Sequence, residues 1–311
     1  ADPEKHYITW QEYIALCKEE SISEETAQDY ANAYTAVGVC LHYPDHYQLC
    51  NYVFLRFKWI IDALFDVLYS DDVKNGELDS RRLHHIWQGE QYAPMRGNLL
   101  LLLELFELCY RVQDQEHLYI VPQRLPDAQE SHGIAIENGV RVQYEYKFMP
   151  KGIITRFICR QKNKIVRGKV WNDAVALSYS GETAFVHEVF SENIIKVVAT
   201  SQHNSDLLNS IVDTLDAIHQ SFLDKGFNLK VEKLIPCSCS VCQNEDAPYY
   251  FEYEHLQKLL VKGKSQEMCR KSYDEQDIRR LLQATQLKSR MLDRANAIGF
   301  VTQHKFYEAF D

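Results

Sequence analysis

The spacing of apolar residues changes close to residue 139, and this change constrains the fold more than any other feature of the sequence. Before it, apolar residues recur every three or four positions, most clearly over 58–69, as in a helix with one buried face. After it, every second residue from Val140 to Phe148 is apolar, as in a strand with one buried and one wet face. We therefore expect an α+β protein in which a mainly helical part precedes an antiparallel sheet.

A polar stretch containing several proline and glycine residues separates the two patterns. It includes Pro122, Pro126 and Gly139 with acidic residues among them, and such a composition is typical of a domain boundary. The chain of 311 residues is also longer than an average single domain. We expect an N-terminal subdomain, 1–136, and a C-terminal α+β subdomain, 137–311.

Helices dominate the expected N-terminal subdomain. Residues 9–12 fit a capping box, in which a Thr hydroxyl and a Glu carboxylate each bind a free backbone N–H. Ser23 is expected to cap a second helix, 23–37, and further helices are expected over 58–69 and 99–110.

Two strand-like runs, 39–43 and 52–56, lie before the third of these helices and are joined by a Pro-Asp turn. Together with the helices they form a winged-helix-like pattern, which many DNA-binding proteins share. However, the candidate recognition helix, 23–37, begins with Glu24 and Glu25 and carries no Lys or Arg, and the whole chain has a formal net charge of −10. Because phosphate binding needs positive charge, we expect no nucleic-acid partner and keep a nucleic-acid-binding regulator only as an alternative.

The C-terminal subdomain is expected to alternate between strands and helices. A helix should follow the strand 140–148, with Ile153 and Phe157 on its buried side and Arg156 and Arg160 opposite. The remaining expected elements are strands at 169–179, 183–190 and 193–199, a helix over 205–223 and a strand at 227–235.

The sequence lacks the common motifs for nucleotide binding and catalysis. It has no phosphate loop, no G-x-S-x-G, no H-E-x-x-H and only twelve glycine residues. The adjacent pair His84-His85 would diverge on a helix, so the two side chains could not share a ligand. We therefore expect no catalytic site, and the alternative of a zinc-dependent enzyme would require an open metal site.

Nine cysteines, an odd number, and no secretory signal favour a reducing, cytoplasmic location. No run reaches the roughly 20 apolar residues that a membrane span needs. Cys237, Cys239, Cys242 and the later Cys269 are possible zinc ligands, but structural sites usually combine two C-x-x-C pairs and this chain has one. We favour unliganded thiols and no cofactor, with zinc as the alternative.

Several segments resemble, in the correct order, the COR domain of Roco proteins. They are Val37-Gly-Val-Cys-Leu-His-Tyr-Pro44, Val53–Trp59, Phe106–Cys109, Leu118–Pro122, Tyr146–Gly152, Arg156–Ile158, Val170-Trp171 and Ile235–Cys242. In this family the COR domain follows a Ras-like Roc GTPase domain. The family includes prokaryotic proteins, among which we expect the parent of this chain, and leucine-rich-repeat kinases of animals.

The resemblance implies a non-catalytic, regulatory chain. In this family the first half of COR contacts the Roc domain, the second half forms a homodimer, and dimerisation is coupled to GTP hydrolysis. The partners implied are therefore a second copy and the Roc domain of the same protein. By the same resemblance, Val170 and Trp171 would face the Roc domain, although the position before Trp171 is aromatic in some relatives. The helix 205–223 would line the dimer seam, with His219 and Phe222 as its candidate residues.

Overall fold

The chain is an α+β protein, as expected. A computed structural model describes residues 5–128, 136, 139–200, 206–243, 245 and 247–285. The chain divides into two compact units, which meet in the sequence between Arg124 and Leu125. The boundary expected after residue 136 borders residues outside the described ranges.

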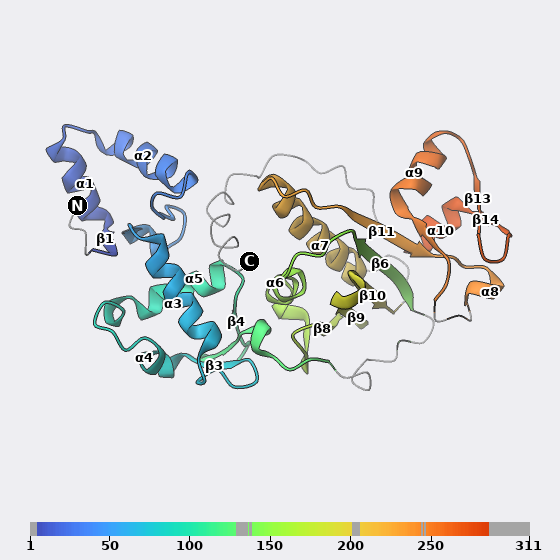
Figure 1. Cartoon of the computed structure of the whole chain (residues 1–311), viewed down its shortest axis with the longest axis horizontal. Coiled ribbons are helices and arrows are strands. Elements are labelled where there is room, and N and C mark those ends of the chain that lie inside the picture. The colour runs from blue at the N-terminus through green and yellow to red at the C-terminus, as the bar shows by residue number, and fades with distance from the viewer. Residues whose placement is uncertain are drawn as a thin grey trace. The chain divides into compact units, whose positions relative to one another are not determined.

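Helices are the main regular elements of the first unit (Figure 1). They are α1 (Trp10–Glu19), α2 (Glu24–Ala36), α3 (Phe57–Tyr69), α4 (Leu83–Ile86) and α5 (Arg96–Leu105). The strands are β1 (Tyr7–Thr9), β2 (Tyr52–Phe54), β3 (Glu77–Asp79), β4 (Tyr110–Arg111) and β5 (Leu118–Ile120). The last three strands form a sheet in the order β3-β5-β4.

The first two helices begin where the sequence predicted. The Thr9 hydroxyl accepts the backbone N–H of Glu12 at 3.1 Å, and the Glu12 carboxylate accepts the backbone N–H of Thr9 at 2.8 Å. The Ser23 hydroxyl accepts the backbone N–H of Thr26 at the start of α2. Both predicted caps are therefore confirmed.

The predicted hairpin of a winged helix is wrong in its pairing. Residues 39–43 form no strand, and Leu41 alone bridges to Phe54. Instead, β2 pairs antiparallel with β1, with Tyr7 opposite Phe54. The sequence prediction missed β1 because a strand of three residues shows too little alternation to be recognised.

The helix predicted over 99–110 is shorter and shifted. It begins at Arg96 and ends at Leu105, and Glu107 has a φ of 59°. A left-handed residue ends an α-helix, so the chain is free to enter β4 at Tyr110. The apolar run nevertheless contributes to the core of this unit, where Leu99, Leu102 and Leu103 are buried.

A seven-stranded antiparallel sheet forms the centre of the second unit, in the order β12-β11-β6-β10-β9-β8-β7. The strands are β6 (Val140–Tyr146), β7 (Ile165–Val170), β8 (Ala174–Tyr179), β9 (Glu182–Val189), β10 (Ile194–Ala199), β11 (Val231–Pro236) and β12 (Tyr250–Glu252). The single strand predicted at 169–179 is in fact β7 and β8, because Asn172 and Asp173 turn the chain between them. The strand predicted at 227–235 begins four residues later, at Val231.

Two helices, α6 (Ile153–Arg160) and α7 (Asp206–Asp224), pack on one face of this sheet. The remaining elements follow β11 (Figure 1). They are α8 (Ser240–Gln243), α9 (Tyr253–Val261), α10 (Ile278–Thr285) and the hairpin of β13 (Gln266–Met268) and β14 (Glu275–Asp277). The predicted capping residue Ser205 of α7 lies outside the described residues.

Two side chains lie on the opposite side from the one predicted. Arg156 was expected on the outer face of α6 but is only 2% exposed, because α7 covers it and Ser221 accepts a hydrogen bond from its guanidinium. Phe148 was expected on the buried face of β6 but is 77% exposed, because the strand ends at Tyr146. None of the described helices combines the length and the apolar composition needed to cross a bilayer.

Candidate functional site

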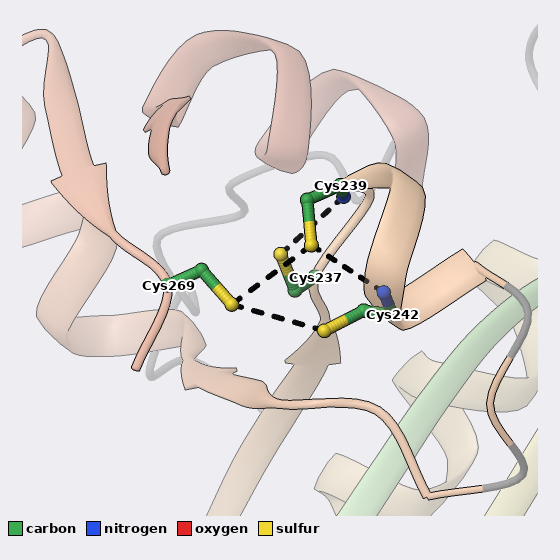
Figure 2. Close-up of side chains that lie close together, drawn as sticks. All are labelled: Cys237, Cys239, Cys242 and Cys269. Carbon is green, nitrogen blue, oxygen red and sulfur yellow. Dashed lines mark hydrogen bonds between the residues drawn. The ribbon is translucent and has the colours of Figure 1, made fainter. Parts of the chain in front are cut away.

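Four cysteines from three segments of the second unit converge on one point (Figure 2). Cys237 directly follows β11, Cys239 and Cys242 lie at and within α8, and Cys269 follows β13. The backbone N–H of Cys237 donates to the carbonyl of Tyr249 at 2.7 Å, which holds the end of β11 against the segment before β12. All four sulfur atoms lie within 4.8 Å of one another.

Backbone N–H groups donate hydrogen bonds to three of the four sulfur atoms. The N–H of Cys239 donates to the sulfur of Cys237, and that of Cys242 to the sulfur of Cys239, both at 3.4 Å. The N–H of Tyr249 donates to the sulfur of Cys242, also at 3.4 Å. These bonds favour the negatively charged thiolate over the neutral thiol.

The four thiols differ in acidity. Burial raises the pKa of Cys237 and of Cys242. Burial also acts to raise the pKa of Cys239, but the Ser272 hydroxyl and the Cys242 N–H outweigh it and lower that pKa to about 6. Burial is likewise outweighed at Cys269, where the N–H groups of Ser272 and Lys271 lower the pKa. Cys239 and Cys269 are therefore the thiols that lose a proton most readily.

The sequence analysis named Cys269, which is distant in the chain, as a possible ligand beside the other three cysteines, and the structure brings all four together. Its sulfur lies 3.7 Å from that of Cys242 and 4.0 Å from that of Cys239. A tetrahedral ion bound by four protein sulfurs keeps no coordination position for a substrate. The arrangement therefore suits a structural metal site better than the open catalytic site that a zinc-dependent enzyme would require.

The candidate dimer residues lie in a polar network between α7 and the sheet. His219 Nε2 and the Tyr146 hydroxyl are 2.7 Å apart, and the Tyr144 hydroxyl donates to Asp216 at 3.0 Å. Burial, with a smaller effect of the Lys233 charge, lowers the pKa of His219 to about 3. The imidazole is therefore neutral at physiological pH.

His219 and Phe222 are each only 5% exposed. Phe222 packs edge-on against Phe227, and the Arg156 guanidinium lies 5.6 Å from the centre of its ring. Leu223, at the end of the same helix, is 44% exposed. Within a single chain, the accessible apolar residue here is therefore Leu223, and the dimer seam through His219 and Phe222 stays a prediction.

The candidate Roc-facing residues lie at one edge of the sheet. Val170 ends the edge strand β7 and is half-buried, whereas Trp171 is buried and its ring packs edge-on against Phe185. The backbone N–H of Trp171 donates to the carbonyl of Ala174 at 2.8 Å, closing the turn into β8. Trp171 thus holds the end of the edge strand β7 through buried contacts. The contact of these two residues with a Roc domain stays a prediction.

Comparison with known families identifies the class of protein. The family model described as "C-terminal of Roc, COR-A domain" matches residues 1–125, and the one described as "C-terminal of Roc, COR-B domain" matches residues 137–284. The chain belongs to the COR domain family of Roco proteins.

The chain spans about a fifth or less of the length of the curated relatives that it matches. A "Roc-COR-CHAT protease" from an unknown prokaryotic organism is 23% identical over 237 residues, which are 73% of this chain and 22% of that protein. The "Probable serine/threonine-protein kinase roco11" of Dictyostelium discoideum is 28% identical over 178 residues, covering 50% of this chain and 12% of that protein. The solved Roco2 RocCORdC of Methanosarcina barkeri bound to GDP is 26% identical, with a TM-score of 0.36 over 40% of each chain.

Proposed function

We propose that this chain is the non-catalytic regulatory part of a cytoplasmic Roco protein and that a Roc GTPase domain of the same polypeptide is its partner. The ordered match to a COR-A and then a COR-B model carries this proposal. The second unit would form a homodimer, and dimerisation would be coupled to GTP hydrolysis by the Roc domain.

The exposed end of α7 supports the dimer part of the proposal. Leu223 is exposed there, and Phe148 lies at the same end of the unit, since Lys147 pairs with Lys230 just after the helix. In a two-fold dimer, each of these residues would meet the same surface of a second copy. The buried side chains of His219 and Phe222 would pack beneath this surface and hold the end of α7 in place. A stable interface should bury more than about 1,000 Å² in total.

The edge strand β7 supports the Roc-facing part. Its Arg167 and Lys169 are exposed, so its backbone edge and its charges are accessible. Val170 would contact the Roc domain directly, and Trp171 would hold the strand in the required position. Binding there would also cover an open sheet edge, which proteins otherwise protect from unwanted pairing.

Light scattering of the purified chain at micromolar concentration tests the dimer. We expect about twice the monomer mass of 36.4 kDa, and Leu223→Asp should restore the monomer mass because it places a charge in an apolar contact. Val261→Asp is a control, since Val261 is also an exposed apolar residue but lies on α9. A monomer mass for the unmodified chain would refute the dimer.

Nucleotide assays separate the regulatory role from a catalytic one. The chain on its own should show no heat of GTP or GDP binding in calorimetry, because it encodes no phosphate loop. In the parent protein with its Roc domain, Leu223→Asp should change the rate of GTP hydrolysis. A monomeric variant with an unchanged hydrolysis rate would refute the coupling.

A further inference from the structure

We propose that Cys237, Cys239, Cys242 and Cys269 bind one structural zinc ion, which fastens the β13–β14 hairpin to the end of β11. This inference is independent of the proposed regulatory function.

The distances between the sulfur atoms suit a single ion. A zinc–sulfur bond of about 2.3 Å in a tetrahedral site separates neighbouring sulfurs by about 3.8 Å. The distances from Cys269 are 3.7 Å to Cys242 and 4.0 Å to Cys239, and all four sulfurs lie within 4.8 Å of one another. A disulfide would bring two sulfurs to about 2.0 Å. An iron–sulfur cluster would spread them further, because its irons and sulfides lie between the cysteines.

The backbone around the sulfurs is already arranged for thiolates. Three of the four sulfurs accept a backbone N–H at 3.4 Å, those of Cys237, Cys239 and Cys242. Such bonds to the ligand atoms orient them and spread their negative charge, as is usual around protein-bound metals.

A positive side chain lies beside the centre. Four thiolates and one Zn²⁺ carry a net charge of about −2, which is costly in a buried place unless it is compensated. The Lys271 ammonium group binds Glu245 and the carbonyl of Ala247, in the segment between Cys242 and Tyr249. Lys271 lies two residues after Cys269 in the sequence. Because its ammonium group also pairs with Glu245, it balances only a small part of the charge of the centre.

The four cysteines make up a large part of the small core around the centre. Its buried residues are Ile235, Phe251, Tyr253, Leu256, Ile278, Leu281 and the four cysteines. The hairpin itself has exposed or half-buried residues on both strands. Side-chain hydrogen bonds from Ser238 to Gln276 and from Lys271 to Glu245 already join the hairpin to the segment after β11. A metal bond between Cys269 and the three cysteines after β11 would add a much stronger link, since metal binding contributes directly to folding.

The four cysteine ligands favour zinc over other metals and a structural role over a catalytic one. Four cysteine sulfurs in a tetrahedral arrangement suit zinc, which needs no redox partner and is closed to further ligands when four protein sulfurs bind it. As the ion binds, each thiol still protonated loses its proton to solvent, and the sulfur lone pair forms the bond to the metal.

Metal analysis of the purified full chain tests the proposal. Mass spectrometry of the metal content, after expression in zinc-containing medium and purification without added metal, should find one zinc per chain. The double variant Cys239→Ser/Cys269→Ser should lose the zinc. Cys50→Ser is the matched control, because Cys50 is a free cysteine of the first unit outside the cluster, and this variant should keep one zinc per chain.

A second measurement uses the unmodified chain, so its result does not depend on whether a cysteine variant folds. Removing the metal from the unmodified chain and adding Co²⁺ should give the visible absorption of tetrahedral cobalt bound to thiolates, and added Zn²⁺ should abolish it. No zinc together with no cobalt spectrum would overturn the proposal, and so would one bound iron in place of zinc. The oligomeric state measured by light scattering plays no part in either result, so failure of the zinc site and failure of the dimer are distinguishable.

Discussion

The core of the first unit and the core around the cysteine cluster differ in the types of residue that they bury. In the first unit, the buried cluster contains aromatic and aliphatic residues from α3, α4, α5 and the strands, among them Phe54, Leu64, Trp87 and Phe106, and Cys109 is its single cysteine. Around the cluster, four of ten buried residues are cysteines. Burial of apolar surface stabilises the first core without any ligand. The second core, by our inference, needs one.

Removal of the metal is expected to have the largest effect on stability, and this effect should be confined to the core around the cysteine cluster. Structural zinc in small domains has an apparent binding free energy of about 10–16 kcal/mol, so chelation should open residues 237–285 locally. Hydrogen exchange followed by mass spectrometry should show faster exchange there, with α3 and α5 unchanged. Equal protection of 237–285 with and without a chelator would show that the second core holds together by packing alone.

Trp87→Ala should damage the first core instead. The Trp87 side chain is fully buried, and its indole N–H donates to the carbonyl of Ala63 in α3 at 2.8 Å. Truncation leaves a cavity and removes this hydrogen bond, so we expect a loss of about 3–5 kcal/mol in the free energy of unfolding. Urea unfolding measures this loss, and the zinc content should not change.

A matched control for this variant is Tyr47→Ala, since Tyr47 is an aromatic residue of the same unit but is largely exposed. It should change the free energy of unfolding by less than about 0.5 kcal/mol. Similar losses for the two variants would mean that the apolar cluster does not dominate the stability of the first unit.

The sequence predicted local elements better than the contacts between them. The capping residues Thr9 and Ser23 and the amphipathic pattern of α3 depend on neighbours within a few positions, and these predictions are confirmed. The pairing of β1 with β2 and the burial of Arg156 depend on segments far apart in the chain, and periodicity does not report such contacts.

The cysteine cluster illustrates the same limit. The C-x-C-x-x-C spacing grouped Cys237, Cys239 and Cys242, and Cys269 was named beside them only as a possible fourth ligand. The fold of the β13–β14 hairpin brings Cys269 to the other three, and the spacing of residues in the sequence does not report such a distant contact.

A smaller, pH-dependent effect should arise from two groups of the second unit, His219 on α7 and Glu188 on β9. Burial lowers the pKa of His219 from 6.5 to about 3, so the unfolded chain binds the proton more strongly and stability falls as the pH drops from 6.5 toward 3. Burial raises the pKa of Glu188 from 4.5 to about 7. Its contribution is present below pH 4.5 and is lost as the pH rises toward 7.

The two effects oppose each other between pH 4.5 and 6.5, so single variants should reveal each slope. In Glu188→Gln, stability should decrease on acidification through this window, by at most about 1.4 kcal/mol per pH unit. In His219→Gln, it should instead decrease as the pH rises. Urea unfolding at several pH values measures both, and identical pH profiles for the two variants would contradict this assignment.

The smallest expected effect concerns the helix starts of the first unit, which rest on local hydrogen bonds rather than on its core. Thr9→Ala removes both hydroxyl bonds of the capping box and should lower the free energy of unfolding by about 1 kcal/mol. Ser23→Ala removes a cap that accepts one backbone N–H at 3.2 Å, so its loss should be no larger. Urea unfolding compares the two variants under the same conditions, with the metal bound. If either substitution lowered the free energy of unfolding as much as Trp87→Ala does, the helix starts would matter to the first unit as much as its apolar cluster. The stability of that unit could then not be attributed to its apolar core alone.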